Sequence, residues 1–587
     1  MAAPSPNYQF NDFATLPVLY NGRVQPLDTL ARQSLLSIQE KTSVKRDDTT
    51  ISPAQWLLDM FTHSSAAYDD KLFKIDYIDL KTELGLDKKD KYFSYNELKE
   101  NIIEIEKKGR AIAQVDSENR SYYQNNLYHL YQKVSLFLAM QNAFLPFHDI
   151  NLEQYTSNYE YSVKEGLKAF NKYNAGDTLT QKEANFLVGF NSNFKFHSKL
   201  AKNSVLYLFP NQQDDRINWN NTGSELLSLL DPNQTLHPLL KQYAAVFSAY
   251  SKQDATAFNT GLMQMKAELA TIQDLNKTLK LETQFHRLNP FYKAMILYII
   301  AFVIALFFYM SNNRYLYRIA SSATYIAFAL HSYGLIARML IQNRPPVTNL
   351  YSSAIFVGWF AIIISMLQDK YFKNKLGTAV ASLLGFITLI VAHHLSFQGD
   401  TLEVMQAVLN SNFWLSTHVV IVTLGYSGTF FAGTLATLYV LASFIKPLSK
   451  EYTQELSKFL VGIICFSLLF SFVGTVLGGI WGDQSWGRFW GWDPKENGAL
   501  LIVIWNAIIL HARLAKRIKT KGLALLCIAG NIVTAFSWFG VNMLGIGLHS
   551  YGFMDEAFFW LLCYCIVQVL LILAGSFNIK PSATKSI

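Results

Sequence analysis

The chain has 587 residues and a formal net charge of +8, and its composition is 51% hydrophobic but only 16% charged. So low a charged fraction argues against a wholly water-soluble protein, and the lack of a long basic tract argues against nucleic acid as a partner. All four cysteines fall inside apolar runs, so no disulfide or thiol nucleophile is expected in the polar part of the chain.

Residues 1–290 have the pattern of a mostly helical, water-soluble domain. The N-terminus has no basic region followed by an apolar one, so it is not expected to be a signal peptide. Asn21-Gly22 marks a turn, and Pro26 and Asp28 open a helix with leucines on one face. Further runs with helical spacing lie near 94–113, 120–145, 160–172, 222–250 and 256–284.

Residues 291–575 contain nine apolar segments that are long enough to cross a bilayer. They lie near 291–310, 319–341, 351–367, 376–393, 414–443, 459–480, 498–512, 523–545 and 556–575. The seventh is short and is expected to extend into the residues before it. The sequence therefore predicts a mainly α fold: a polytopic α-helical membrane bundle of about nine spans, preceded by the helical domain 1–290 and followed by a tail at 576–587.

Lysine and arginine predict the orientation of this bundle. One set of loops, together with the tail, holds fifteen of them, whereas the opposite loops hold only Arg344, Arg488 and Lys495. By the positive-inside rule the first set is cytoplasmic, so domain 1–290 is expected outside the cytoplasm. Because no signal precedes that domain, we expect the natural product to have membrane segments upstream of Met1, or this chain to start internally.

The stretch WGDQSWGRFWGWDPKENG (481–498), between the sixth and seventh segments, is the most informative part of the sequence. Its four tryptophans are Trp481, Trp486, Trp490 and Trp492. One or two would indicate an aromatic belt at the membrane surface. Four of them, interleaved with glycine and fixed charges, favour an aromatic shelf beside a flat, apolar ligand on the extracytoplasmic side.

The charged residues of this stretch have two interpretations. Arg488 or Lys495 is available to neutralise acidic groups of such a ligand. Alternatively, Asp493, Lys495 and Glu496 start a helix, with Asp493 as its cap before a proline. The second role does not exclude a ligand contact by Lys495.

Several of these motifs resemble those of one family. WGRFWGWDPKE resembles the WWD signature of haem-handling membrane proteins, and WDPKENGALLIVIWNAIILHAR resembles the CcsA (ResC) type of cytochrome c biogenesis protein. The stretch NRPPVTNLYSS (343–353) resembles the family's P-(S/T)-N-x-Y loop, and a GR-x-x-PLDT-x-A stretch resembles a segment of its long members. The resemblance covers roughly 291–575.

The resemblance implies that histidines hold the iron of haem b. It places His418 and His549, which flank the tryptophan stretch, on opposite faces of the porphyrin. It matches His511 to an intramembrane site whose second ligand comes from a CcsB (ResB) half or another partner. The alternative for His418 and His549 is a pair of interfacial histidines bonded to backbone carbonyls.

The other membrane histidines are weaker candidates. His331 lies on the second span, where pairing inside the bundle is the alternative to a ligand role. His393 and His394 end the fourth span and point about 100° apart on a helix, so one iron is not easily held by both. We expect these two to be interfacial histidines.

By this resemblance the chain is a component of a holocytochrome c synthase, or haem lyase, of system II. It would move haem b across the membrane and present it to the C-x-x-C-H motif of an apocytochrome c. The implied partners are that apocytochrome, a CcsB/ResB-type protein or a missing upstream half, thiol-reducing proteins and the lipid bilayer. The expected location is the bacterial inner membrane. Because no nucleophile or general-base pair is expected, the protein would act by positioning.

Two other functions fit the same sequence. One is a haem exporter or chaperone that delivers the cofactor without attaching it. The other is a haem-lyase subunit of the multi-protein maturation pathway, whose members share the WWD signature.

Overall fold

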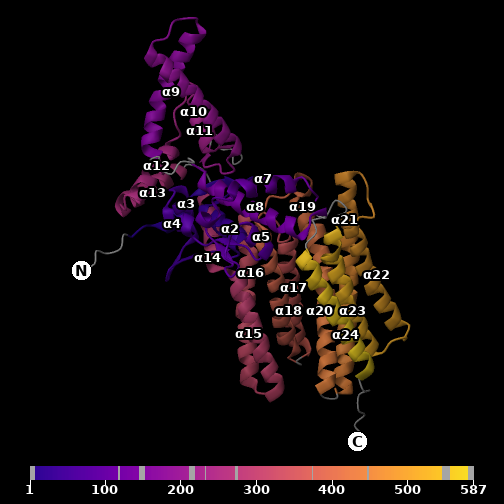
Figure 1. Cartoon of the computed structure of the whole chain (residues 1–587). Helices are drawn as coiled ribbons and strands as arrows, with labels where there is room; N and C mark the ends of the chain where they lie inside the picture. Colours follow the sequence, from indigo (N-terminus) through magenta and orange to yellow (C-terminus); the bar gives the residue numbers. More distant parts are fainter. Residues whose placement is uncertain are drawn as a thin grey trace, which may run out of the picture. The chain divides into compact units, whose positions relative to one another are not determined.

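The structure, a computed structural model, describes residues 7–116, 119–144, 152–210, 218–231, 233–270, 275–372, 375–445, 448–544 and 555–578 (Figure 1). Internal contacts divide the chain into two compact units, Met1–Arg287 and Leu288–Ile587. Both units are built mainly from α-helices, which confirms the predicted fold class.

The first unit is helical with short strand pairs. Its helices are α1 (Phe10–Ala14), α2 (Leu27–Gln39), α3 (Pro53–Phe61), α4 (Ser65–Asp69), α5 (Ile78–Glu83), α6 (Tyr95–Leu98), α7 (Ile102–Ala113), α8 (Tyr122–Gln141), α9 (Leu152–Asn174), α10 (Gln181–Asn203), α11 (Thr222–Ser228), α12 (Pro238–Ser251), α13 (Ala255–Leu269) and α14 (Leu275–Leu288). The antiparallel pairs found in its described part are β1 (Pro17–Tyr20) with β2 (Arg23–Pro26), β3 (Val44–Arg46) with β4 (Thr49–Ile51), β5 (Phe73–Lys74) with β6 (Tyr92–Phe93), and β7 (Phe209–Pro210) with β8 (Trp219–Asn220).

The predicted turn and helix near the N-terminus are confirmed. Asn21 and Gly22 both have positive φ, at 50° and 76°, and they join β1 to β2. The helix α2 follows directly, and Leu27 and Leu30 on its inner face are fully buried. Two-residue turns with both φ values positive match the twist of a hairpin, which explains why Asn-Gly stands here.

Three of the longer predicted runs are divided in the structure. The run 222–250 becomes α11 and α12, because Pro238 occupies the first turn of a new helix behind its cap His237. The run 256–284 falls on α13 and α14, and the run 94–113 on α6 and α7. The sequence prediction also missed α10, whose start is a capping box at Thr180 and Glu183.

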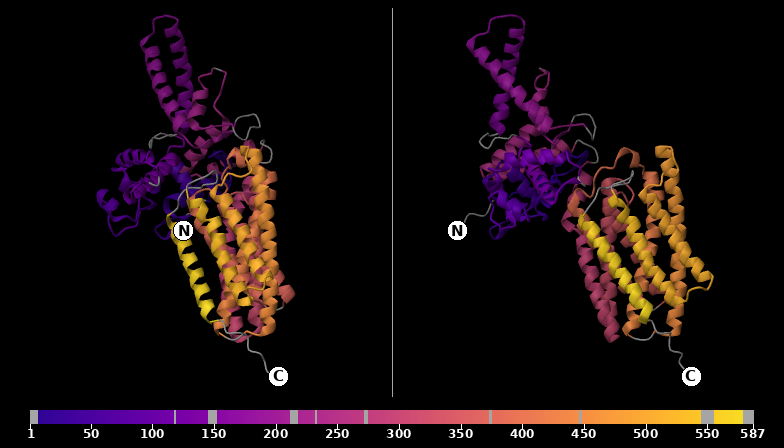
Figure 2. Two further views of the ribbon diagram at one scale, coloured as in Figure 1. Left: turned by 90° about the vertical axis from the view of Figure 1, so that its right-hand side faces the viewer. Right: turned by 45° about the vertical axis from the view of Figure 1, so that its right-hand side comes forward.

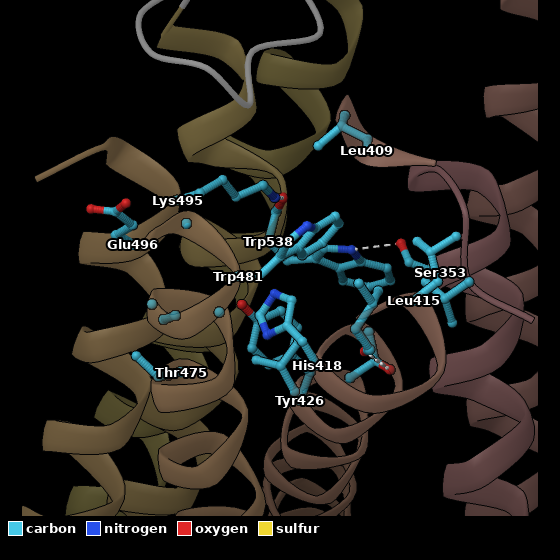
Figure 3. A pocket seen from close by; sticks show the side chains of 18 of the residues that line it. Ser353, Leu409, Leu415, His418, Tyr426, Thr475, Trp481, Lys495, Glu496 and Trp538 are labelled. Carbon is cyan, nitrogen blue, oxygen red and sulfur yellow. Dashed lines mark hydrogen bonds between the residues drawn. The ribbon is translucent and has the colours of Figure 1, made fainter. Parts of the chain in front are cut away.

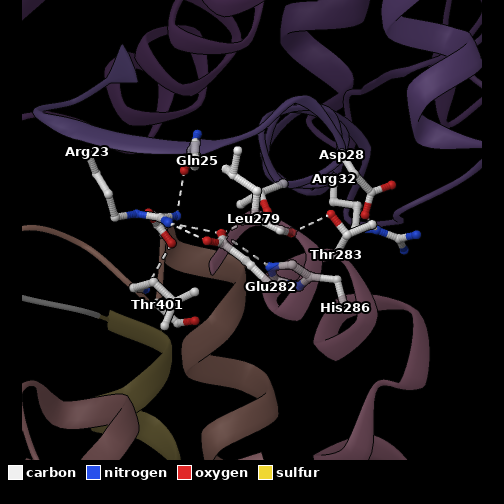
Figure 4. Close-up of polar contacts among 12 residues, drawn as sticks. Arg23, Gln25, Asp28, Arg32, Leu279, Glu282, Thr283, His286 and Thr401 are labelled. Carbon is white, nitrogen blue, oxygen red and sulfur yellow. Dashed lines mark hydrogen bonds and ion pairs between the residues drawn. The ribbon is translucent and has the colours of Figure 1, made fainter. Parts of the chain in front are cut away.

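Glu282 on α14 is a buried carboxylate held by the first hairpin and by α2 (Figure 4). Arg23 donates to both carboxylate oxygens at 2.9 Å, and the Thr29 hydroxyl donates to one of them at 2.8 Å. Burial alone would raise the pKa of Glu282, but the charges and hydrogen bonds of Arg23 and His286 together outweigh it and hold the pKa below its usual value. The ion pair therefore ties α14 to the N-terminal hairpin.

We expect Arg23→Met to lower the free energy of unfolding of the first unit by about 3–5 kcal/mol, because it leaves Glu282 buried without its cation. Thermal unfolding and limited proteolysis of the full chain in detergent measure this. Because the pKa of Glu282 is lower in the folded protein, its carboxylate contributes fully to the free energy of unfolding above its unfolded pKa of about 4.3. This contribution is lost as the pH falls through the folded pKa.

Arg110→Met is the matched control. Arg110 pairs with Glu106 four residues away, with 71% of its side chain exposed, and such pairs contribute about 0–1 kcal/mol. Equal stability of the two variants would contradict a special role for the buried pair.

The second unit is a bundle of long helices (Figure 2). They are α15 (Pro290–Ser311), α16 (Arg314–Gln342), α17 (Leu350–Phe372), α18 (Leu376–Leu395), α19 (Asn412–Trp414), α20 (Val420–Ile445), α21 (Lys450–Trp486), α22 (Pro494–Leu514), α23 (Thr520–Trp538) and α24 (Asp555–Asn578). Short turns are η2 (Ser396–Gln398), η3 (Ala407–Leu409), the π-helical η4 (Leu415–Val419) and η5 (Gly540–Leu544). Within the described ranges, nine helical segments are long and apolar enough to cross a membrane, which confirms the predicted number.

The helix α20 lies at the centre of contacts in this bundle and packs against α17, α18, α21, α23 and α24. Glycines allow the close approach, since a methyl group at Gly425 would collide with Ser471, and one at Gly433 with Asn531. The Asn531 amide in turn donates to Gln568 on α24 at 3.1 Å. Buried amides thus join the helices around α20.

The tryptophan stretch 481–498 is partly helical and partly a loop. The helix α21 continues through Trp486 and ends at Gly487, whose φ of +69° is typical of a helix C-cap. The next helix, α22, begins at Pro494, so the seventh span does start inside the stretch. The two helix ends fix most of the stretch in place.

Candidate functional site

A pocket lies among η4, α20, α21, α22 and α23, with the loop before α17 on another side (Figure 3). Its empty space is about 1210 Å³, including the part open to solvent. Its walls are mostly apolar and aromatic, with a few polar groups. Ligand sites of drug-sized and larger molecules have this character.

His418 enters the pocket from the π-helical turn η4. Its Nδ1 donates to the carbonyl oxygen of Gly474 on α21 at 2.8 Å. A carbonyl only accepts, so Nδ1 carries the hydrogen and Nε2 is the nitrogen with the lone pair. Gly478 keeps room for the ring, because a Cβ there would lie 2.6 Å from Cε1 of His418. One turn of α21 thus fixes both the tautomer and the position of the imidazole.

Tryptophans form the wall beside this histidine. Trp481 lies edge-to-face with the imidazole at 5.8 Å between centroids, and it stacks on Trp414 at 6.3 Å with an interplanar angle of 12°. Trp538 on α23 donates from its indole to the Ser353 hydroxyl at 2.9 Å. These contacts hold flat aromatic surfaces in fixed orientations.

Three of the four predicted tryptophans line the pocket, namely Trp481, Trp486 and Trp490. Trp492 does not line it. It is 71% exposed, has a φ of +57°, and contacts Trp490 edge-to-face at 6.1 Å. The left-handed conformation of Trp492 turns the chain toward the start of α22.

Lys495 is the basic residue of the stretch that lines the pocket, and its ammonium donates to the Trp538 carbonyl at 2.8 Å. Asp493 caps α22, which confirms the predicted helix start. Its partner in the capping box, Glu496, also accepts from the Gly491 amide at 2.8 Å. Arg488 is exposed, and neither Arg488 nor Asp493 is among the lining residues.

Of the other two predicted iron ligands, His511 does not line this pocket, and His549 is not among the described residues. His511 is exposed in the last turn of α22, where its Nδ1 donates to the Ala507 carbonyl at 2.8 Å. It lies thirteen residues after Gly498, which is about 20 Å along a helix.

His331 is paired inside the bundle. It is fully buried, its Nε2 donates to the Ile355 carbonyl at 3.1 Å, and its Nδ1 faces the Tyr298 hydroxyl at 3.5 Å. Both ring nitrogens are therefore engaged, which favours the structural alternative. His393 and His394 lie at the end of α18 with their rings 6.1 Å apart at 81°.

Sequence reasoning missed several residues of the pocket. They include Ser353, Tyr426 and Trp538. A signal was present in α20 and its preceding turn, where positions 415, 418, 419, 422, 423 and 426 recur at the spacing of one helical face. That spacing identifies one face of the helix, but it does not identify the residues of other helices that lie across the pocket from it.

Comparison with known proteins gives one family and several relatives. The family described as Cytochrome C assembly protein matches residues 347–549, a range that contains the described pocket residues from Val347 to Trp538. Protein NrfI of Wolinella succinogenes is 29% identical over 364 residues, which cover 59% of this chain and 40% of that protein.

The cytochrome c biogenesis protein CcsA of Chlamydomonas reinhardtii is 32% identical over 230 residues, which cover 38% of this chain and 65% of that protein. The chain therefore spans less than two thirds of either relative. Among solved structures, Cytochrome c Heme Lyase CcmF matches with a TM-score of 0.38 at 15% identity, over 50% of this chain and 51% of that chain.

Proposed function

We propose that this chain, whose residues 347–549 belong to the cytochrome c assembly protein family and are CcsA-like, binds haem b in the pocket at His418 and presents it to an apocytochrome c. The observation that carries the proposal is the His418 imidazole, anchored through Nδ1 in a tryptophan-walled pocket. Histidines that ligate metals usually donate their other ring N–H to a carbonyl or carboxylate in this way.

The residues present fit a haem. The walls are flat and aromatic, and Gly478 of α21 leaves room for the imidazole of His418, since a Cβ there would lie 2.6 Å from its Cε1. A neutral histidine is a common axial ligand of haem iron. Lys495 is the cation placed to neutralise a propionate.

The remaining iron ligands belong to the same proposal. His549 would hold the iron from the opposite face. His511 would serve an inner site on the path of haem from the cytoplasmic side, with a second ligand from a CcsB/ResB-type protein. This assignment puts the tryptophan stretch and residues 1–290 outside the cytoplasm of a bacterial inner membrane.

The chain's own groups act by positioning. The bound haem supplies the two vinyl groups to which the thiols of the client's C-x-x-C-H motif add. His418 would hold the iron, and Trp481 would pack beside the ring and shield it from water. The capping contacts of Asp493 and Glu496 hold the loop between α21 and α22 in place.

The experiment is to express the chain with a CcsB half in cells that lack their own maturation system, together with a client cytochrome. We expect a haem-stained band that survives denaturing electrophoresis. A client with both motif cysteines changed to serine is the control and should show no band. Haem recovered outside the cells without covalent product would contradict attachment and favour an exporter.

A further inference from the structure

Tyr426 is a polar residue of the pocket wall with no role so far. It lies on α20, lines the pocket and is 6% exposed. In the part of the chain that the structure describes, its hydroxyl has no hydrogen-bond partner. Because Tyr426 lines the pocket, its hydroxyl is available to a ligand that enters, and a hydrogen bond made there contributes to binding.

The other hydroxyl groups that line the pocket are already engaged. Thr423 donates to the Val419 carbonyl at 2.8 Å, and Thr475 to the Ser471 carbonyl at 2.7 Å. The Ser353 hydroxyl donates to the Leu350 carbonyl and accepts from Trp538. Thr348 and the hydroxyl of Ser352 face each other at 3.4 Å. Tyr426 is therefore the exception among these hydroxyls.

Tyr426 and His418 face the pocket from one side of the same helix (Figure 3). They are eight residues apart, in a run of lining residues at positions 415, 418, 419, 422, 423 and 426 that recur at the spacing of one helical face. A ligand held by His418 is thus bound within the same cavity as the Tyr426 hydroxyl.

The chemistry of a haem leaves few groups for a hydroxyl donor. Its pyrrole nitrogens bind the iron, and its methyl and vinyl groups are apolar, so its strong acceptors are the two propionate carboxylates. We propose, resting on the function proposed above, that Tyr426 donates a hydrogen bond to a propionate and makes the pocket selective for the free acid. Lys495, from α22, provides the second donor of the pocket for such groups.

The test is a titration of purified, haem-depleted full-length protein, followed by the Soret band. Two ligands are compared, haem and its dimethyl ester, which keeps the ring and the iron but lacks both charges. Tyr426→Phe removes only the hydroxyl and is expected to weaken binding of haem about tenfold to a hundredfold, the range of a hydrogen bond to a charged group. Binding of the ester should weaken less, by about twofold to tenfold, because the ester carbonyl can accept a hydrogen bond but carries no charge.

Tyr439→Phe is the matched control, because Tyr439 lies on the same helix, is 5% exposed and does not line the pocket. It should bind both ligands as the unchanged protein does. Unaltered haem affinity of Tyr426→Phe would overturn the inference, and so would an equal loss for haem and ester. Failure of the unchanged protein to bind either ligand would instead contradict the proposed function.

Discussion

His418→Ala is expected to lower the haem that co-purifies with the protein more than about tenfold, since even loss of a supporting contact to a metal ligand costs about 10–100-fold in affinity. The Soret band of any remaining haem should shift because one axial nitrogen is lost. Added imidazole should restore part of the original spectrum. Absorbance spectra and a pyridine haemochrome assay of the purified protein measure both effects.

The control is His394→Ala. His394 is exposed at the end of α18, its Nδ1 donates to the Ile390 carbonyl at 2.9 Å, and it does not line the pocket. Its haem content should stay unchanged. His549→Ala tests the second proposed ligand in the same assay. Unaltered spectra for both His418→Ala and His549→Ala would contradict the ligand assignment.

Gly478→Ala should lower the content of bound haem nearly as much as His418→Ala does, although it removes no functional group. The new methyl carbon would lie 2.6 Å from Cε1 of His418, so the imidazole must move and its bond to Gly474 must lengthen. At a site that acts by positioning, a displacement near 1 Å can lower the reaction rate about a hundredfold. We expect a matching loss of haem-stained client cytochrome and a disturbed Soret band.

Gly462→Ala separates this effect from a general weakening of α21. Gly462 lies on the same helix, and a Cβ there would meet nothing within 4 Å. Alanine favours helix relative to glycine, so this variant should be at least as stable as the unchanged protein. Equal haem loss in both variants would show that contact with His418 is not the cause.

The parts of the fold that could be predicted are those with a strong local signal. Nine apolar segments follow from length and hydropathy, and the start of α22 follows from Asp493 and Pro494. The division of the run 222–250 was missed although Pro238 marked it. The helical spacing of apolar residues continues across Pro238, but a proline at this position starts a new helix, and spacing alone does not show that break.

The pocket itself was less predictable, because it depends on contacts between distant helices. Trp481 and Trp486 lie on a regular helix, whereas Trp492 lies in a loop and a positive φ directs it away from the lining. Tyr426 shares a helical face with His418, whereas Trp538 has no motif and only the packing of α23 brings it into the same pocket. The two bonds that engage His331 likewise come from α15 and α17, which no local pattern specifies.

The length of α21 has a consequence for how a client meets the pocket. Its 37 residues extend about 55 Å, compared with about 30 Å for the hydrocarbon layer of a bilayer. Its charged residues lie at its two ends, so the end that carries Trp481 and Trp486 is expected at headgroup level. If the chain presents haem as proposed, a soluble client would collect it from the aqueous side without entering lipid, and delivery should be insensitive to acyl chain length.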